Sequence, residues 1–272
     1  VNHNNLRYNL CYYIIIYSHI LAHGHKIIMQ IAFISDLHLS PNTPDKNQLF
    51  YCLLQKFVDD KFDALYILGD FFDYWLGDDD INEFSQAMIN KFTQATKHLK
   101  IYFLHGNHDF AIGKVFCQQT GIQRIQDMTT LYTGEHKILL SHGDTFCTLD
   151  LGYQKMKRII QNPVVIAILR KLPLSMRYKI KALMERGSHA TNHKTPKPPE
   201  TYHVVDSAII DFADKYGADT IIHGHTHRPG HYSIQRAEAS RLNRYETPDW
   251  EDHEAGGYLV YSNNCFKFEH HR

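Results

Sequence analysis

The chain has 272 residues, of which 43% are hydrophobic and 21% charged. This balance is typical of a globular protein and excludes a disordered chain. Lys plus Arg and Asp plus Glu number 29 each, so net charge favours no particular partner. The 20 histidines mildly favour a metal enzyme, because histidine is the commonest metal ligand.

The first 28 residues differ from the rest of the chain. The apolar run at 10–17 is shorter than a membrane-spanning helix, polar residues soon interrupt it, and no small-residue cleavage site follows. Met29 stands directly before the first predicted strand. We therefore expect residues 1–28 to be an N-terminal extension outside the fold, with Met29 as the natural start.

Five short apolar runs each end in a cluster of Asp, His, Gly or Asn. Runs of this length, rich in Ile, Leu and aromatic residues, predict buried strands. Apolar spacing predicts helices at 47–59 and 84–99, and strands that alternate with helices indicate an α/β fold. The polar clusters then gather at the carboxyl ends of the strands, where such folds place functional loops. The predicted strands are 31–34, 64–68, 101–104, 138–140 and 220–222.

The stretch 151–199 predicts a few amphipathic helices inserted between the fourth and fifth strands. Between Lys155 and Lys197 it holds eleven Lys or Arg and one acid, Glu185, with apolar patches between them. A solvated basic face is one interpretation. The interleaved apolar residues favour a lid over an anionic, partly apolar ligand, or a contact with a membrane surface.

The five clusters together predict a centre for two divalent ions, which can activate water and stabilise a leaving oxygen. Asp36 and His38 project the same way from a strand end, and the two oxygens of Asp70 can each hold an ion. Asn107 offers a neutral amide oxygen. The mixed nitrogen and oxygen set suits manganese, iron or zinc better than calcium. The remaining candidate ligands are His142, His225 and His227.

The motifs Asp36-x-His38, Gly69-Asp70, Gly-Asn107-His-Asp, His142-Gly-Asp and Gly-His225-x-His resemble those of calcineurin-like metallophosphoesterases. This resemblance implies a sandwich of two β-sheets flanked by helices, with an inserted helical lid, spanning residues 29–272 as one domain. It also implies that His108 assists the leaving group or transition state, oriented by Asp109, while His223 is structural. One ion would be held by Asp36, His38, Asp70 and His227, and the other by Asp70, Asn107, His142 and His225.

Longer strings resemble one family more closely. Residues 69–80, 142–154 and 223–229 are similar to the UDP-2,3-diacylglucosamine pyrophosphohydrolases of lipid A biosynthesis. The resemblance implies a manganese enzyme that releases UMP and a diacylglucosamine 1-phosphate. It would act as a peripheral protein on the cytoplasmic face of the inner membrane, with no nucleic acid and no obligate protein partner.

The same resemblance indicates residues that contact the substrate. One departure is His108, where that family usually has arginine: arginine is a permanent phosphate clamp, whereas neutral histidine can donate a proton. A second is the contact lysine, which counting places at Thr195, one residue from Lys194. The substrate-contact candidates are Asn107, His108, Asp150, Ser188, Asn192, Lys194, Thr195 and His225.

Three alternatives remain open at this stage. One is a phosphodiesterase of broad specificity, or a pyrophosphatase acting on soluble nucleotides, which would have no need of a basic and apolar insert. Another is a non-catalytic scaffold, although no ligand of the motif is missing. A nucleic-acid enzyme is the third, but the basic residues form no polar stripe that could follow a phosphate backbone.

Overall fold

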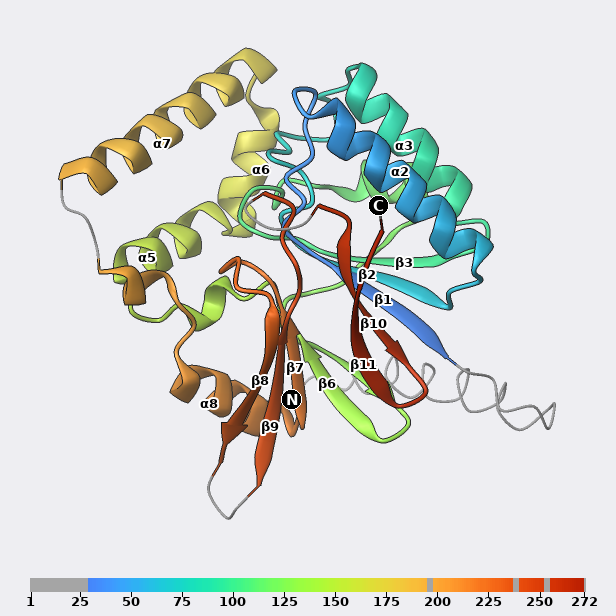
Figure 1. Cartoon of the computed structure of the whole chain (residues 1–272). Helices are drawn as coiled ribbons and strands as arrows, with labels where there is room; N and C mark the ends of the chain where they lie inside the picture. Colours follow the sequence, from blue (N-terminus) through green and yellow to red (C-terminus); the bar gives the residue numbers. More distant parts are fainter. Residues whose placement is uncertain (1–28, 195–197, 237–239, 252–254, 272) are drawn as a thin grey trace, which may run out of the picture.

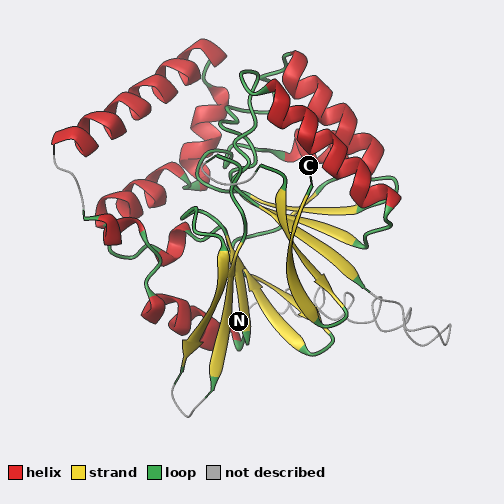
Figure 2. Ribbon diagram, viewed as in Figure 1, coloured by secondary structure: helices red, strands yellow, loops and turns green. Residues whose placement is uncertain are grey.

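Two β-sheets face each other and carry helices on their outer sides (Figures 1 and 2). The structure is a computed structural model that describes residues 29–194, 198–236, 240–251 and 255–271; for 185–194 and residue 199 only the backbone is described. The expected N-terminal extension, residues 1–28, lies outside this part of the chain.

The first sheet has the strand order β11-β10-β1-β2-β3-β4, and the second has β5-β6-β7-β9-β8. Strands β1 to β4 run parallel, and β10 pairs antiparallel with β1. In the second sheet β6, β7 and β9 are parallel. The strands are β1 (Gln30–Ile34), β2 (Ala64–Leu68), β3 (Lys100–Leu104), β4 (Gln123–Arg124), β5 (Thr129–Thr133), β6 (His136–Leu140), β7 (Thr220–His223), β8 (Gly230–Gln235), β9 (Arg241–Glu246), β10 (Gly257–Ser262) and β11 (Cys265–His270).

Helices α2, α3 and α4 cover the outer face of the first sheet, and α8 covers that of the second (Figure 1). Helices α5, α6 and α7 follow β6 and precede β7 in the chain, and they lie to one side of both sheets. The helices are α2 (Pro44–Asp59), α3 (Glu83–Ala95), α4 (Lys114–Thr120), α5 (Leu151–Ile160), α6 (Pro163–Lys171), α7 (Leu174–Lys194) and α8 (Asp206–Tyr216), with 3-10 turns η1 (Asp144–Phe146) and η2 (Pro199–Tyr202).

Alternate residues of β1 show why the sheet is buried on both faces. Ala32 and Ile34 pack under the helices with Phe50 of α2, whereas Ile31 and Phe33 pack between the two sheets. Strands covered on both faces read as continuous apolar runs, which is the pattern that the sequence shows. All five predicted strands and both predicted helices are present, but α3 ends at Ala95 and not at Leu99 as predicted.

The inserted segment is helical, as predicted, and it is amphipathic in an unusual way. Large apolar side chains point outward on all three helices, among them Leu151, Ile159, Val164 and Leu183, each at least 62% exposed. Over the residues that the structure describes, no helix is both long enough and apolar enough to cross a membrane.

Candidate active site

Loops that follow β1, β2, β3, β6 and β7 meet at one edge of the two sheets. The ligands predicted from sequence lie in these loops, and two groups of them place their ligand atoms within 4.8 Å of one another. The first group is Asp36, His38 and His227, and the second is Asp70, His142 and His225. The structure therefore brings together side chains that are up to 191 residues apart, from Asp36 to His227.

Asp70 belongs to the second group and also faces the first. Its Oδ2 atom is 4.0 Å from Nε2 of His38 in the first group and 3.5 Å from Nε2 of His142 in the second. Asn107 joins the second group, because its Oδ1 atom is 3.1 Å from Nε2 of His142. In the first group, Nε2 of His227 is 3.8 Å from Oδ1 of Asp36. This is the arrangement expected of a carboxylate shared by two ions.

The backbone at these residues adopts an uncommon conformation. Nine non-glycine residues in the described part of the chain have positive φ, and five of them are candidate ligands. Such conformations cost free energy and cluster at functional sites, where the surrounding structure enforces them. The five are Asp36, His38, Asp70, His225 and His227.

Two glycines allow the loops to approach this closely. A Cβ atom at Gly106 would lie 2.1 Å from Oδ1 of Asp70, and one at Gly224 would lie 2.1 Å from Oδ2 of Asp36. Only glycine fits at either position. The glycines of the Gly-Asn and Gly-His motifs thus have a steric role beside the ligands that follow them.

Hydrogen bonds behind the candidate ligands fix their orientation. Nδ1 of His142 donates to the carbonyl oxygen of Leu68, 2.9 Å away, which directs Nε2 toward Asp70 and Asn107. Oδ2 of Asp36 accepts from the backbone N–H of His225 at 2.9 Å and from the hydroxyl of Ser35. Both sheets are therefore tied together at the site.

Asp249 is a buried residue of the site that the sequence motifs do not indicate. Its Oδ1 atom is 3.8 Å from Nδ1 of His227, on the side of the ring away from Asp36. A carboxylate behind a metal-binding histidine orients the ring and raises its basicity. The nearby Pro-Asp-Trp sequence after β9 belongs to no motif of this site, so only the fold could reveal this contact.

The expected role of Asp109 in orienting His108 is wrong. Nδ1 of His108 donates instead to the backbone carbonyl of Asp73, 2.6 Å away. Both oxygens of Asp109 accept backbone N–H groups: that of Gly106 at 2.7 Å and that of Phe71 at 2.9 Å. Asp109 is thus a buried brace between the loops after β2 and β3, because these inward-pointing N–H groups need an acceptor.

Burial and charge set the protonation of the site. Burial lowers the pKa of His38 to about 3 and that of His225 to about 4, so both rings are neutral at pH 7, as ligands must be. For His142, burial favours the neutral ring, but the charge of Asp70 outweighs it and raises the pKa well above its usual value. Burial also raises the pKa of Asp36. Positive charge beside Asp36 would therefore favour its ionised form.

The residues fit a pair of divalent ions. Oδ1 of Asp36 is buried without a hydrogen-bond partner, which is costly unless a cation satisfies it. Imidazole, carboxylate and amide donors are the set that manganese, iron and zinc accept. The geometry supports two adjacent ions that share Asp70.

The structure describes the side chains of some of the expected substrate contacts. Asp150 is buried and caps the first turn of α5, accepting the N–H of Tyr153 at 2.9 Å. The hydroxyl of Tyr153 donates to Asp144 at 2.6 Å, and its ring lies 5.9 Å from that of His225, so α5 is anchored beside the centre. Three further candidates, Ser188, Asn192 and Lys194, lie where only the backbone is described. Thr195 lies outside the described residues.

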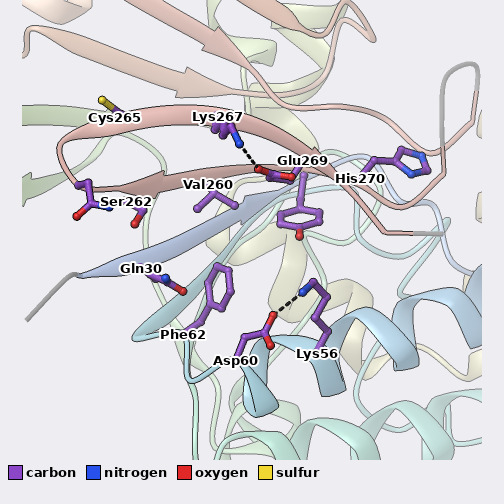
Figure 3. A pocket seen from close by; sticks show the side chains of 12 residues that line it. Gln30, Lys56, Asp60, Phe62, Val260, Ser262, Cys265, Lys267, Glu269 and His270 are labelled. Carbon is purple, nitrogen blue, oxygen red and sulfur yellow. Dashed lines mark hydrogen bonds and ion pairs between the residues drawn. The ribbon is translucent and has the colours of Figure 1, made fainter.

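A cavity of about 810 Å³ lies away from this centre (Figure 3). Residues of α2, β10 and β11 line it, and its charged groups pair with one another, Lys56 with Asp60 and Lys267 with Glu269. None of the candidate ligands contributes to it. It is therefore not the candidate active site.

Comparison with known proteins agrees with this geometry. Residues 29–229 match the family model described as calcineurin-like phosphoesterase. The chain belongs to the calcineurin-like phosphoesterases, a family that uses divalent metal ions.

Several curated relatives share one name. The chain is 38% identical over 226 residues to a UDP-2,3-diacylglucosamine hydrolase of Pseudomonas putida KT2440, covering 81% of this chain and 91% of the relative. It is 37% identical over 235 residues to the protein of that name from Vibrio cholerae El Tor Inaba N16961, with 86% and 95% covered. The protein of that name from Pseudomonas aeruginosa UCBPP-PA14 is 35% identical over 224 residues, with 82% and 92% covered.

Proposed function

We propose that the protein hydrolyses the pyrophosphate bond of UDP-2,3-diacylglucosamine, giving UMP and 2,3-diacylglucosamine 1-phosphate in lipid A biosynthesis. The observation that supports this proposal is the two adjacent groups of candidate ligands at the loop edge of a chain whose relatives bear that enzyme name. The assignment of residues 29–272 to one domain with a helical insert is part of the proposal.

The ligand roles follow the geometry. Asp36, His38 and His227 would hold one ion, Asn107, His142 and His225 the other, and Asp70 would bridge them. We propose manganese as the ion in both positions, since the set mixes nitrogen and oxygen donors. When bound, the ions supply positive charge that activates water and stabilises the leaving oxygen.

We propose that His108 acts on the leaving group. Its Nε2 atom is 4.0 Å from Oδ2 of Asp70, and its side chain is 26% exposed, so a substrate can reach it. The proton on Nδ1 is held by the carbonyl of Asp73. The ring therefore presents Nε2 toward the centre, where it can hold or transfer a proton to a departing phosphate oxygen.

The inserted helices offer a surface for the acyl chains and the membrane. Lys and Arg side chains lie among exposed apolar ones along α5 and α7, whereas α6 is apolar until it ends in Arg170 and Lys171. Arg177 of α7 donates to Asp79 and to the carbonyl of Leu76, both in the loop after β2, so the insert is fastened to a loop of the centre. We propose peripheral binding to the cytoplasmic face of the inner membrane, with Asp150, Ser188, Asn192 and Lys194 or Thr195 contacting the substrate.

A comparison of two substrates tests the proposal. UDP-2,3-diacylglucosamine and UDP-N-acetylglucosamine share the pyrophosphate, but only the first carries two long acyl chains. Each buried methylene is worth about 0.8 kcal/mol, so burying only four in the transition state favours the acylated substrate by roughly 3 kcal/mol, or on the order of 100-fold in kcat/KM. Equal kcat/KM for the two would contradict the proposed substrate.

Membrane binding has a matched pair of variants. Val164 on α6 is 66% exposed and Val115 on α4 is 51% exposed, so Val→Ser at each removes a similar apolar area. We expect Val164→Ser to weaken sedimentation with vesicles of anionic phospholipid and Val115→Ser to leave it unchanged. If both variants sediment like the unsubstituted chain, α6 does not face the membrane.

A further inference from the structure

A tyrosine in the loop after β2 packs against the ring of His108. The ring centroids of Tyr74 and His108 are 4.7 Å apart and the ring planes are inclined at 42°, within the range of contacting aromatic pairs. His38 meets the ring of His108 edge to face, with centroids 4.8 Å apart. The hydrogen bond from Nδ1 to the carbonyl of Asp73 fixes one atom of the His108 ring, but the ring can still turn about that atom. The contacts with Tyr74 and His38 therefore fix its plane.

Helix α7 of the insert contacts the same tyrosine. Nζ of Lys181 lies 4.0 Å from the centre of the Tyr74 ring, close enough for an ammonium group to be attracted by the aromatic face. One turn earlier on α7, Arg177 donates to the carbonyl of Leu76, which stands two residues after Tyr74. Contacts thus run from α7 through Tyr74 to His108.

We propose that Tyr74 is a positioning residue for His108, and that Lys181 holds the Tyr74 ring in place. The insert would then act on the leaving-group step itself, in addition to contacting the substrate. This inference rests on the role proposed above for His108. Its physical basis is that a proton is transferred efficiently only over a short, well-aligned path, and misplacing a catalytic group by about 1 Å can cost on the order of 100-fold in rate.

Double-mutant cycles on soluble substrates test the role of Tyr74. The phenyl and p-nitrophenyl esters of UMP differ only in their leaving group, and neither carries an acyl chain. Tyr74→Leu should lower kcat roughly tenfold for the phenyl ester, whose poorer leaving group needs a proton, and less for the p-nitrophenyl ester. Tyr74→Phe keeps the ring and should stay within about twofold of the unsubstituted chain. In a His108→Ala background, Tyr74→Leu should cause no further loss.

Lys181→Met keeps most of the side chain but removes its charge. It should lower kcat for the phenyl ester by about threefold, and it should add nothing when Tyr74 is already leucine. Tyr51→Leu and Lys91→Met are the matched controls, because Lys91 of α3 lies 5.2 Å from the Tyr51 ring of α2, and neither should change the ratio of the two rates. A loss from Tyr74→Leu that persists without His108, or a loss from Lys181→Met that persists without the Tyr74 ring, would overturn the assignment.

A spectroscopic measurement separates this inference from the proposed function. The NMR signals of the carbon-bound ring protons of His108 are identified in the zinc-loaded chain by their loss in His108→Ala, since zinc, unlike manganese, is diamagnetic. Tyr74→Leu should shift these signals because it removes the neighbouring ring current, whereas Tyr74→Phe and Tyr51→Leu should leave them in place. Unshifted signals in Tyr74→Leu would refute the contact. A chain without hydrolase activity would still show the shift, so the two proposals fail separately.

Discussion

Asp109 gives the sharpest test of how the loops of the centre are held. Asp109→Ala would leave the N–H groups of Gly106 and Phe71 without their acceptor at 2.7 and 2.9 Å. Asp109 is fully buried, and each donor left unsatisfied costs about 1 to 3 kcal/mol. We therefore expect the free energy of unfolding to fall by about 2 to 6 kcal/mol.

The assay is urea unfolding in a metal chelator, so that ion binding does not contribute to stability. Asp109→Asn keeps one acceptor oxygen and should fall between Asp109→Ala and the unsubstituted chain. Asp73→Ala is the control, because its partly exposed carboxylate braces no loop, and it should change stability by less than about 0.5 kcal/mol. If Asp109→Ala unfolded like the unsubstituted chain but changed the pH profile of kcat, Asp109 would act through His108 and the brace would be refuted.

Three further outcomes are expected. Gly224→Ala places a Cβ 2.0 Å from the Ser35 hydroxyl and should abolish binding of the second equivalent of manganese in calorimetry; normal stoichiometry would contradict the steric argument. Arg177→Met loses bonds to the Asp79 carboxylate and to the carbonyl oxygens of Leu76 and Leu172, so stability should fall by about 1 to 3 kcal/mol, while turnover of the diacyl substrate falls more than that of a small chromogenic diester. Burial raises the pKa of Cys147 to about 12, so a thiol reagent at pH 8 should not label Cys147 until the chain unfolds. Exposed Cys265 should be labelled in the folded chain, and mass spectrometry of the peptides would show both results.

The ligand set was predictable from sequence because each ligand directly follows a strand. The apolar run 64–68, for example, ends at Gly69-Asp70, and the carboxyl ends of parallel strands meet at one edge. The insert was predictable as helical and amphipathic for the same kind of reason: its pattern is local. Asp36 and His38 are two residues apart at a strand end and were predicted to share one ion, but only the five clusters together made that prediction specific.

The supporting contacts were not predictable, because they depend on how separate loops face each other. Asp109 stands next to His108 in sequence, which suggested a pair, yet its oxygens face the backbone of two loops. Asp249 lies behind His227 only because the loop after β9 returns to the site.

Release of UMP is the measurement that tests the central claim most directly. The purified chain is incubated with UDP-2,3-diacylglucosamine and manganese, and the nucleotide product is identified by mass spectrometry. We expect UMP and 2,3-diacylglucosamine 1-phosphate in equal amounts. No product should form in a metal chelator or with Asp70→Ala. Asp60→Ala, a surface control, should keep full activity. UMP formation by Asp70→Ala at the normal rate, or no UMP from the manganese-loaded chain, would contradict the account.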